Sequence, residues 1–314
     1  MISVRRVLYA TDLSPASEAA WHEARRLGRL FDAEIVATHV VAPPLIFPDE
    51  GYVPPEVYDE IVEGARRSAQ DAFDRLLASV PGSGLRVRIR LMDGPAAQRI
   101  LEAVTEESAD LLVVGTRGRT GLERALLGSV ADRLVRQAAC PVLTVPPLPS
   151  KPRSEIRRIC FATDFSPSSR AAWSWVVALA MKANADVDLV HVTFDPVADR
   201  HLSPDSIARM AAALQDQGRL EVERFLERSE LPRERVQLHL ARGVAGEQIV
   251  HWARERSADL IVMGTHGWSG VVRWMLGSVA SHVIQAAPCP VLTVTLASIT
   301  AHAPTRAQAT GGAR

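Results

Sequence analysis

The sequence predicts an α/β fold made of two tandem, doubly wound (Rossmann-like) domains, each with a five-stranded parallel sheet flanked by helices. Three observations lead to this prediction. The stretch VLYATDLSPAS at 7–17 returns as ICFATDFSPSS at 159–169, and SADLLVVGTRG at 108–118 returns as SADLIVMGTHG at 257–267. A repeat of about 150 residues is long enough to bury its own core. Within each copy, short apolar runs alternate with helical patterns, which favours parallel strands joined by helices.

The duplication also indicates the domain boundaries. We expect a first domain over 1–146 and a second over 156–297, because both copies close with the same stretch, CPVLTV. The Pro-rich residues between them, 147–155, are expected to form a linker. Residues 298–314 lose apolar periodicity and are rich in Ala, Thr and Gly, so we expect a disordered tail there.

The first domain opens with a β-α-β unit. A short apolar run at 5–10 predicts a strand. Ser14 is the expected N-cap of the helix that follows, and Pro15 is its expected first residue. Apolar residues then recur at helical spacing as far as Phe31, and the apolar run at 33–40 predicts a second buried strand.

The rest of the domain continues the alternation of helix and strand. Ser129 is expected to cap the last helix, with Asp132 three residues on as a capping-box partner. The second domain has the same order, from RRICFA to PVLTV. The remaining elements predicted for the first domain are a helix at 57–79, a strand at 85–92, a helix at 95–108, a strand at 109–115 and a strand at 140–145.

Composition limits the partners and the location of the protein. Lys and Arg together number 36, and so do Asp and Glu, so there is no global basic field to attract nucleic acid. The N-terminus turns polar after a few residues and no apolar run reaches membrane-spanning length, so we expect a cytoplasmic protein without membrane contact. Three cysteines without a C-x-x-C pair argue against a disulfide framework and a zinc cluster, and we assign no metal-ligating residues.

Two glycine loops carry the strongest functional signal. Each follows the fourth strand of its domain and has the form G-x2-G-x9-G-S. The first two glycines allow a tight turn close to a ligand, and the last glycine and the serine place N–H groups at a helix start, where anions bind. In a doubly wound sheet, ligands bind at this carboxyl edge. The loop residues are Gly115, Gly118, Gly128 and Ser129 in the first copy and Gly264, Gly267, Gly277 and Ser278 in the second.

These loops differ from a Walker-type phosphate loop. The pattern G-x-x-x-x-G-K-[ST] occurs nowhere, and neither lysine of the chain lies in a loop. Charge neutralisation must therefore come from arginine, from His266 or from a divalent metal ion. No residue is an evident activator of water, so we assign no catalytic residue and expect little or no turnover of bound nucleotide. The arginines available are Arg117, Arg119 and Arg124 in the first loop and Arg273 in the second.

These residues resemble the universal stress protein family, specifically its nucleotide-binding branch in tandem-domain form. The resemblance covers about residues 4–146 and 156–296 and rests on the two ATD stretches and the two glycine loops. It implies ATP as the ligand, with Mg²⁺ or Mn²⁺, and a regulatory role in the stress response. It also implies that the fifth strands of the two domains pair edge to edge, which would cover two exposed strand edges.

The resemblance further implies a position for each site residue. Relatives often have glycine where this chain has Ala10 and Ala162, which adds only a methyl group near the ligand. His266 stands where the first copy has Arg117, and this difference is expected to separate the two sites in affinity. By this resemblance, Asp12 and Asp164 would lie near the base and ribose, Ala10 and Ala162 beside the same pocket, Val40 and Val192 against adenine through backbone groups, the glycines with Ser129 or Ser278 around phosphate, and Val130 and Val279 behind it.

Three classes of function remain open from the sequence. The first is an ATP-binding regulatory protein whose nucleotide state sets its contacts with protein partners or with other copies of itself. The second is an enzyme, either a slow ATPase or one of adenylate chemistry, although ATDLSPAS and ATDFSPSS stand where that chemistry uses S-G-G-x-D-S. The third is a nucleotide-free interaction scaffold. His39 and His191 are expected to be structural, and Cys140 and Cys289 to be buried.

Overall fold

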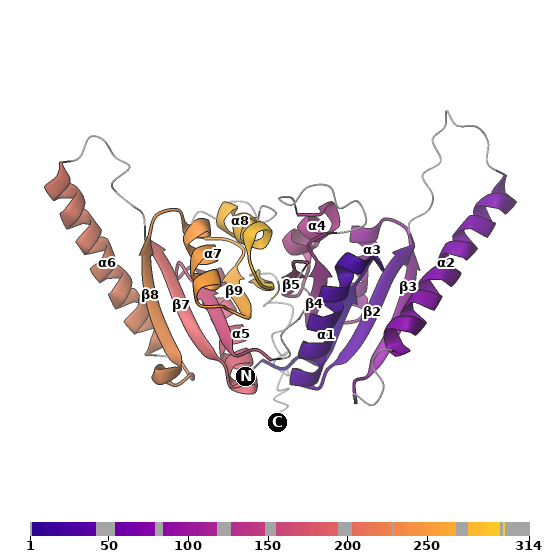
Figure 1. Cartoon of the computed structure of the whole chain (residues 1–314), viewed down its shortest axis with the longest axis horizontal. Helices are drawn as coiled ribbons and strands as arrows, with labels where there is room; N and C mark the ends of the chain where they lie inside the picture. The colour runs from indigo at the N-terminus through magenta and orange to yellow at the C-terminus, as the bar shows by residue number, and fades with distance from the viewer. Residues whose placement is uncertain are drawn as a thin grey trace, which may run out of the picture.

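The computed structural model describes residues 2–41, 54–78, 84–117, 127–147, 155–193, 203–227, 229–267, 276–295 and 298. Within these ranges the two halves of the chain alternate strands and helices in the same order (Figure 1). The first half contains β1 (Arg6–Ala10), the 3-10 helix η1 (Pro15–Ser17), α1 (Glu18–Phe31), β2 (Glu34–Val41), α2 (Pro55–Ala78), β3 (Val87–Asp93), α3 (Ala96–Glu106), β4 (Leu111–Gly115), α4 (Ser129–Gln137) and β5 (Val142–Val145). The second half contains β6 (Arg158–Ala162), α5 (Pro167–Ala183), β7 (Asp186–Thr193), α6 (Pro204–Leu226), the 3-10 helix η4 (Arg233–Arg235), β8 (Val236–Arg242), α7 (Ala245–Glu255), β9 (Leu260–Gly264), α8 (Ser278–Ala286) and β10 (Val291–Val294).

The ten strands form one continuous sheet in the order β3-β2-β1-β4-β5-β10-β9-β6-β7-β8. Within each half, all neighbouring strands are parallel, which confirms the predicted five-stranded parallel sheets. The halves meet where β5 pairs antiparallel with β10, with Leu143 opposite Leu292. The pairing of the fifth strands is therefore confirmed, and neither of them is an exposed edge.

The junction between β5 and β10 is symmetrical in its side chains. The Thr144 hydroxyl donates to the Val291 carbonyl oxygen at 3.2 Å, and the Thr293 hydroxyl donates to the Val142 carbonyl oxygen at 3.1 Å. Both valines are buried, with at most 1% of their surface exposed. The junction is thus part of the common core of the two halves.

Helices cover both faces of the sheet. Side chains alternate between the faces along each strand, as parallel strands buried on both sides require. Tyr9 of β1 packs on one face, in a core that includes residues of α1, α2, α5 and α6. Its neighbours Leu8 and Ala10 pack on the other face, in a core with residues of α3, α4, α7 and α8. In Figure 1, α2 and α6 form the outer flanks of the molecule, and α4 and α8 lie near its centre.

The duplication extends to the backbone conformation. Non-glycine residues with positive φ are uncommon, and they persist where the surrounding structure holds them. Among the described residues they occur in pairs at matching positions of the two halves. These pairs are Leu13 and Phe165, Asp32 and Asn184, and Ser108 and Ser257.

The first helix of the first half begins later than predicted. Ser14 and Pro15 start a 3-10 turn, η1, and the α-helix itself begins at Glu18. In the second half, the matching Ser166 and Pro167 start α5 directly. The predicted linker and tail lie largely outside the described residues, so the domain limits stay predictions. Over the part of the chain that the structure describes, no helix has the length and apolar character needed to cross a membrane.

Candidate functional site

Each half of the chain places its predicted site residues at the carboxyl ends of its strands. Asp12 follows β1 and Gly115 ends β4, and these neighbouring strands mark the point where the strand order reverses. Asp164 and Gly264 hold the matching places after β6 and at the end of β9. At the junction β5 and β10 run antiparallel, so these two strands end on opposite sides of the junction, and each half keeps its own set of strand ends. The chain therefore has two separate candidate sites.

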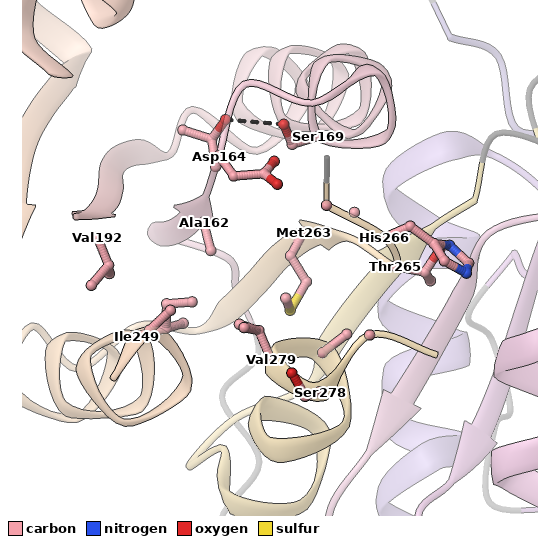
Figure 2. A pocket seen from close by; sticks show the side chains of 16 residues that line it. Ala162, Asp164, Ser169, Val192, Ile249, Met263, Thr265, His266, Ser278 and Val279 are labelled. Atoms are coloured by element: carbon pink, nitrogen blue, oxygen red, sulfur yellow. Dashed lines mark hydrogen bonds between the residues drawn. The ribbon is translucent and has the colours of Figure 1, made fainter. Parts of the chain in front are cut away.

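In the second half, the described residues line an open cavity of about 210 Å³. It lies between the ends of β6, β7 and β9 and the starts of α5, α7 and α8 (Figure 2). All nine residues that the sequence analysis named for this half line the cavity. They are Ala162, Asp164, Val192, Gly264, His266, Gly267, Gly277, Ser278 and Val279.

Other residues that the sequence analysis did not single out also line the cavity. Ile249 and Met263 supply apolar surface from α7 and β9 (Figure 2). Their sequence signal is that of ordinary core residues, so the sequence gives no reason to place them at a site. Two threonines, in contrast, stand within the repeated ATD and GT stretches and could have been included on that ground. The additional lining residues are Thr163, Ser169, Ala245, Ile249, Met263, Thr265 and Ala280.

The loop after the first strand of each half holds its aspartate in the same way. In the second half, the Thr163 hydroxyl oxygen accepts the N–H of Phe165 at 3.0 Å, and Phe165 has a φ of 59°. The N–H of Ser166 donates to Asp164 Oδ1 at 3.0 Å. These bonds fix the direction of the carboxylate at the edge of the cavity. In the first half, Leu13 donates to Thr11 Oγ1 at 3.0 Å and Ser14 donates to Asp12 Oδ1 at 3.1 Å.

The glycine loops end at helix starts that glycine caps. Gly277 is the N-cap of α8, and its N–H donates to the Thr265 carbonyl oxygen at 3.0 Å. Ser278 is therefore the first helical residue, and its hydroxyl is not used as a cap. The N–H groups of the first helical turn have no acceptor within the helix. Among the described residues, the N–H groups of Ser278 and Val279 have no acceptor, and both residues line the cavity.

The same arrangement corrects two sequence predictions for the first half. Gly128, and not Ser129, is the N-cap of α4, and no side chain caps this helix. Asp132 pairs with Arg136 on its own helix instead of forming a capping box. The N–H of Gly128 donates to the Thr116 carbonyl oxygen at 2.9 Å, so it is not a free donor for an anion. This hydrogen bond joins residues that are far apart in the chain, so local capping rules do not include it.

Two glycines of the second loop are required by close packing. A Cβ atom at Gly264 would lie 2.6 Å from Ser168 Oγ and 2.8 Å from the Ser169 backbone nitrogen. A Cβ atom at Gly267 would lie 2.6 Å from Asp164 Oδ2. All three distances are well inside van der Waals contact. At Gly264 the obstacle includes the backbone of α5, which excludes a side chain, whereas at Gly267 the Asp164 carboxylate would have to move.

The histidines divide into two kinds. As expected, His39 and His191 are structural, because Nδ1 of each ring lies 2.8 Å from a backbone carbonyl oxygen, that of Thr11 or Thr163. His266 turns its Nδ1 to the Thr265 hydroxyl at 2.8 Å. Its Nε2 is buried and has no hydrogen-bond partner in the described part of the chain.

The first half places its predicted site residues in the matching positions. Ala10 and Val40 lie at the carboxyl ends of β1 and β2 and belong to one core with residues of α3 and α4. Val130 packs against that core from the first turn of α4. Arg117 comes two residues after the end of β4. Gly118, Arg119, Arg124 and, in the second half, Arg273 lie outside the described residues.

The three cysteines of the chain belong to the core on one face of the sheet. Cys140, Cys160 and Cys289 are all buried, as expected for two of them. Burial raises the pKa of the Cys140 thiol to about 12 and that of Cys160 well above its ordinary value, so neither is a reactive thiolate. Among the described residues, no three His, Cys, Asp or Glu side chains are grouped so that they could hold a metal ion.

The fold and the site define a class of protein, namely doubly wound α/β domains that present a glycine loop and a helix start at the carboxyl edge of the sheet. The model of the universal stress protein family matches residues 3–146 and 155–295. The chain therefore belongs to the universal stress protein family, a family of the stress response, in its tandem form.

Known relatives agree with this assignment. A universal stress protein of Mycolicibacterium smegmatis is 31% identical over 297 residues, which cover 92% of this chain and 96% of the relative. One of Methanocaldococcus jannaschii is 35% identical over 153 residues, 48% of this chain and 85% of the relative. Among solved structures, a universal stress protein from Archaeoglobus fulgidus covers 93% of this chain and 97% of its own with a TM-score of 0.66. At 20% identity, that structure supports the fold alone.

Proposed function

We propose that the protein binds ATP with a divalent cation at the second-half cavity and at the matching site of the first half, and that the bound nucleotide sets its contacts with protein partners. One observation carries this proposal. The residues that the sequence motifs and the family resemblance assign to a nucleotide site come from separate segments of the second half, and they line one cavity. Random placement of such residues would scatter them over the surface and the core.

The composition of the cavity suits the nucleoside part of ATP. Ala162, Val192, Ile249 and Met263 provide an apolar wall for a base. The carboxylate of Asp164 stands at the edge of this wall and can accept hydrogen bonds from ribose hydroxyls or from an amino group. Ligand sites of this kind combine apolar walls with a few fixed polar groups.

The start of α8 suits the phosphate part. Its first N–H groups and the positive end of the helix dipole attract an anion. The Ser278 hydroxyl does not cap the helix and can donate to a phosphate oxygen. A divalent ion would be held by phosphate oxygens with hydroxyl or water ligands, which suits the absence of a side-chain metal cluster among the described residues.

We further propose that turnover is slow. The titratable side chains that line the cavity are Asp164 and His266. One is oriented by backbone contacts at the nucleoside end, and the other gives Nδ1 to Thr265. A carboxylate oriented by a backbone N–H and an imidazole held by a threonine differ from the usual arrangement of a general base that activates water. Phosphate release well below about 1 per second is the expected result, and a faster rate would replace this proposal by an ATPase.

Titration calorimetry with ATP and with GTP, with and without Mg²⁺, tests the binding proposal. Mass spectrometry of nucleotide released from the denatured protein complements it. Ser278→Asp should weaken ATP binding by charge repulsion, while a carboxylate in the first turn is favourable for the helix itself. Ser281→Asp adds the same charge on the same helix away from the cavity lining and is the matched control. If calorimetry shows no heat at millimolar ATP and no nucleotide is released from the denatured protein, the interaction scaffold is favoured instead.

A further inference from the structure

The loop after β9, of which the structure describes residues 265–267 and 276–277, is fastened at His266 to the start of α5 by two buried hydroxyl groups. Ser166 Oγ donates to the carbonyl oxygen of His266 at 3.2 Å, and Ser168 Oγ donates to the same oxygen. Ser166 is 1% exposed and Ser168 2%. The strand end is also close to this helix start, since a Cβ at Gly264 would collide with Ser168. The loop therefore takes its position from α5.

This fastening determines what the loop presents to the cavity. The C=O and N–H groups of a trans peptide point in opposite directions. Because the His266 carbonyl is held toward α5, the N–H of Gly267 in the same peptide plane is turned away from α5. Both residues line the cavity. A ligand anion thus meets a loop whose backbone is already oriented.

The first half lacks this fastening. Ala16 stands at the position of Ser168 and has no hydroxyl group. Ser14, which matches Ser166, donates its hydroxyl to Asp12 Oδ1 at 2.7 Å. Ser17 donates its hydroxyl to the Ser14 carbonyl oxygen, also at 2.7 Å. The hydroxyl groups at this helix start are therefore directed to their own loop.

The two halves also differ in the space around the glycine that ends the fourth strand. A Cβ at Gly115 would have its nearest neighbour, the Arg117 carbonyl oxygen, at 3.4 Å. Its contacts with the helix start, at Ala16 and Ser17, would be at 3.9 Å. At Gly264 the corresponding contacts are 2.6 to 2.9 Å. The end of the fourth strand in the first half thus packs less closely on its helix start than the end of β9 does.

We propose that Ser168 is a positioning residue of the second site, and that its hydroxyl fixes the loop after β9 so that this site binds nucleoside triphosphate more tightly than the first, where Ala16 replaces it. The inference rests on the proposed nucleotide function and adds an order of affinity to it. A loop that is already ordered loses less conformational entropy on binding. One net hydrogen bond corresponds to an affinity ratio of about 3- to 10-fold.

Photolabelling with 8-azido-ATP and Mg²⁺, at a concentration that labels less than half of the protein, tests the inference on the full chain. Digestion and mass spectrometry then assign each label to a peptide of the first or the second half. We expect the wild-type protein to carry most of its label on the second half. Ser168→Ala should lower that preference by about 3- to 10-fold. Ala16→Ser should raise labelling of the first half, a gain that loss of structure cannot produce.

Ser174→Ala is the matched control, because Ser174 is an exposed serine further along the same helix. It should leave the labelling ratio unchanged. Equal labelling of both halves in the wild type, or a ratio that Ser168→Ala and Ala16→Ser both leave unchanged, would overturn the inference while the proposed function stands. If neither half carries label that an excess of ATP prevents, the proposed function is overturned instead. If Ser168→Ala fails to fold, Ala16→Ser alone decides the question.

Discussion

The two halves of the molecule begin their first helix differently, although both leave the first strand through the same Ala-Thr-Asp sequence. In the first half, Pro15–Ser17 form a 3-10 turn, and the Ser14 side chain caps nothing. In the second, α5 starts at Pro167, and Ser166 accepts the N–H of Ser169 as a true N-cap. Duplication has therefore kept the strand and the aspartate but not the helix start. That start is the element in contact with the glycine loop, so the difference lies at the candidate sites.

The junction of β5 and β10 is the opposite case, because the two halves share it. Val291→Glu places a charge where the side chain is 0% exposed. An unpaired buried charge costs about 3–5 kcal/mol of unfolding free energy. Since β5 and β10 pair along this seam, we expect probes in both halves to report the loss together. Denaturant unfolding followed in each half separately is the measurement.

Val142→Glu, on the other strand of the seam, should give the same result. Val244→Glu is the control, because Val244 is 61% exposed and the change should stay within about 0.5 kcal/mol. Loss of only the half that carries the substitution would show that the two sheets are independent, against the common core inferred from their pairing.

The fourth-strand glycines separate the two halves more sharply. Gly264→Ala should cost about 2–3 kcal/mol of unfolding free energy, because the new methyl group meets backbone atoms of α5 that cannot move away. Gly115→Ala should cost less than about 1 kcal/mol, since its nearest contact would be an ordinary 3.4 Å. Urea titration of both variants compares them directly. Equal costs would mean that the looser fit of the first loop is not real.

The parts of this structure that the sequence predicts are those that depend on local patterns. Alternating apolar runs predict the strands, and the repeated stretches predict two similar halves. Of the nine second-half residues that meet at the cavity, the glycine-loop residues follow from motif spacing, because the carboxyl ends of parallel strands lie at one edge. Ala162, Asp164, Val192 and Val279 follow from the family resemblance. The fifth-strand pairing follows from an apolar strand that needs a partner, together with the family resemblance.

Other features depend on contacts that local patterns do not contain. Ser129 has the sequence of an N-cap, but Gly128 takes that place through its bond to the Thr116 carbonyl oxygen. Ile249 and Met263 face the cavity only because α7 and β9 come together there. Ser168 looks like any helix-start serine until its hydroxyl is seen on the His266 carbonyl oxygen. In each case the decisive partner is about 10 or more residues away in the chain.

A buried glutamate of α1 predicts a pH dependence that comes from one half only. Glu23 of α1 is 2% exposed, and Trp175 stands at the matching position of α5. Burial raises the pKa of Glu23 to about 7, and the charge of Arg26, with which it forms an ion pair, lowers it by less. Arg26 also donates to the Glu155 carbonyl oxygen at 3.4 Å, which links the two halves.

Because the folded-state pKa of Glu23 lies above its unfolded value of about 4.5, the folded state binds the proton more tightly. Its stabilising contribution is complete below about pH 4.5 and is lost as the pH rises through about 7. The unfolding free energy of the wild-type protein should fall by about 2 kcal/mol as the pH rises through this range, and in Glu23→Gln this decrease should be absent. Glu18→Gln, an exposed glutamate of the same helix, should leave the decrease in place. A wild-type stability that does not fall between pH 5 and 7.5 would contradict this assignment.

The smallest expected effect separates serines that look alike in the sequence. Ser166→Ala removes a side chain that caps α5 and also contacts the loop after β9, so it should cost about 1 kcal/mol of unfolding free energy. Ser129→Ala and Ser278→Ala change the first residue of a helix that glycine already caps, and each should cost less than about 0.5 kcal/mol. If both also weaken ATP binding in calorimetry, their hydroxyl groups serve the ligand and not the helix. If Ser129→Ala instead loses as much stability as Ser166→Ala, Ser129 caps its helix after all and its role is structural.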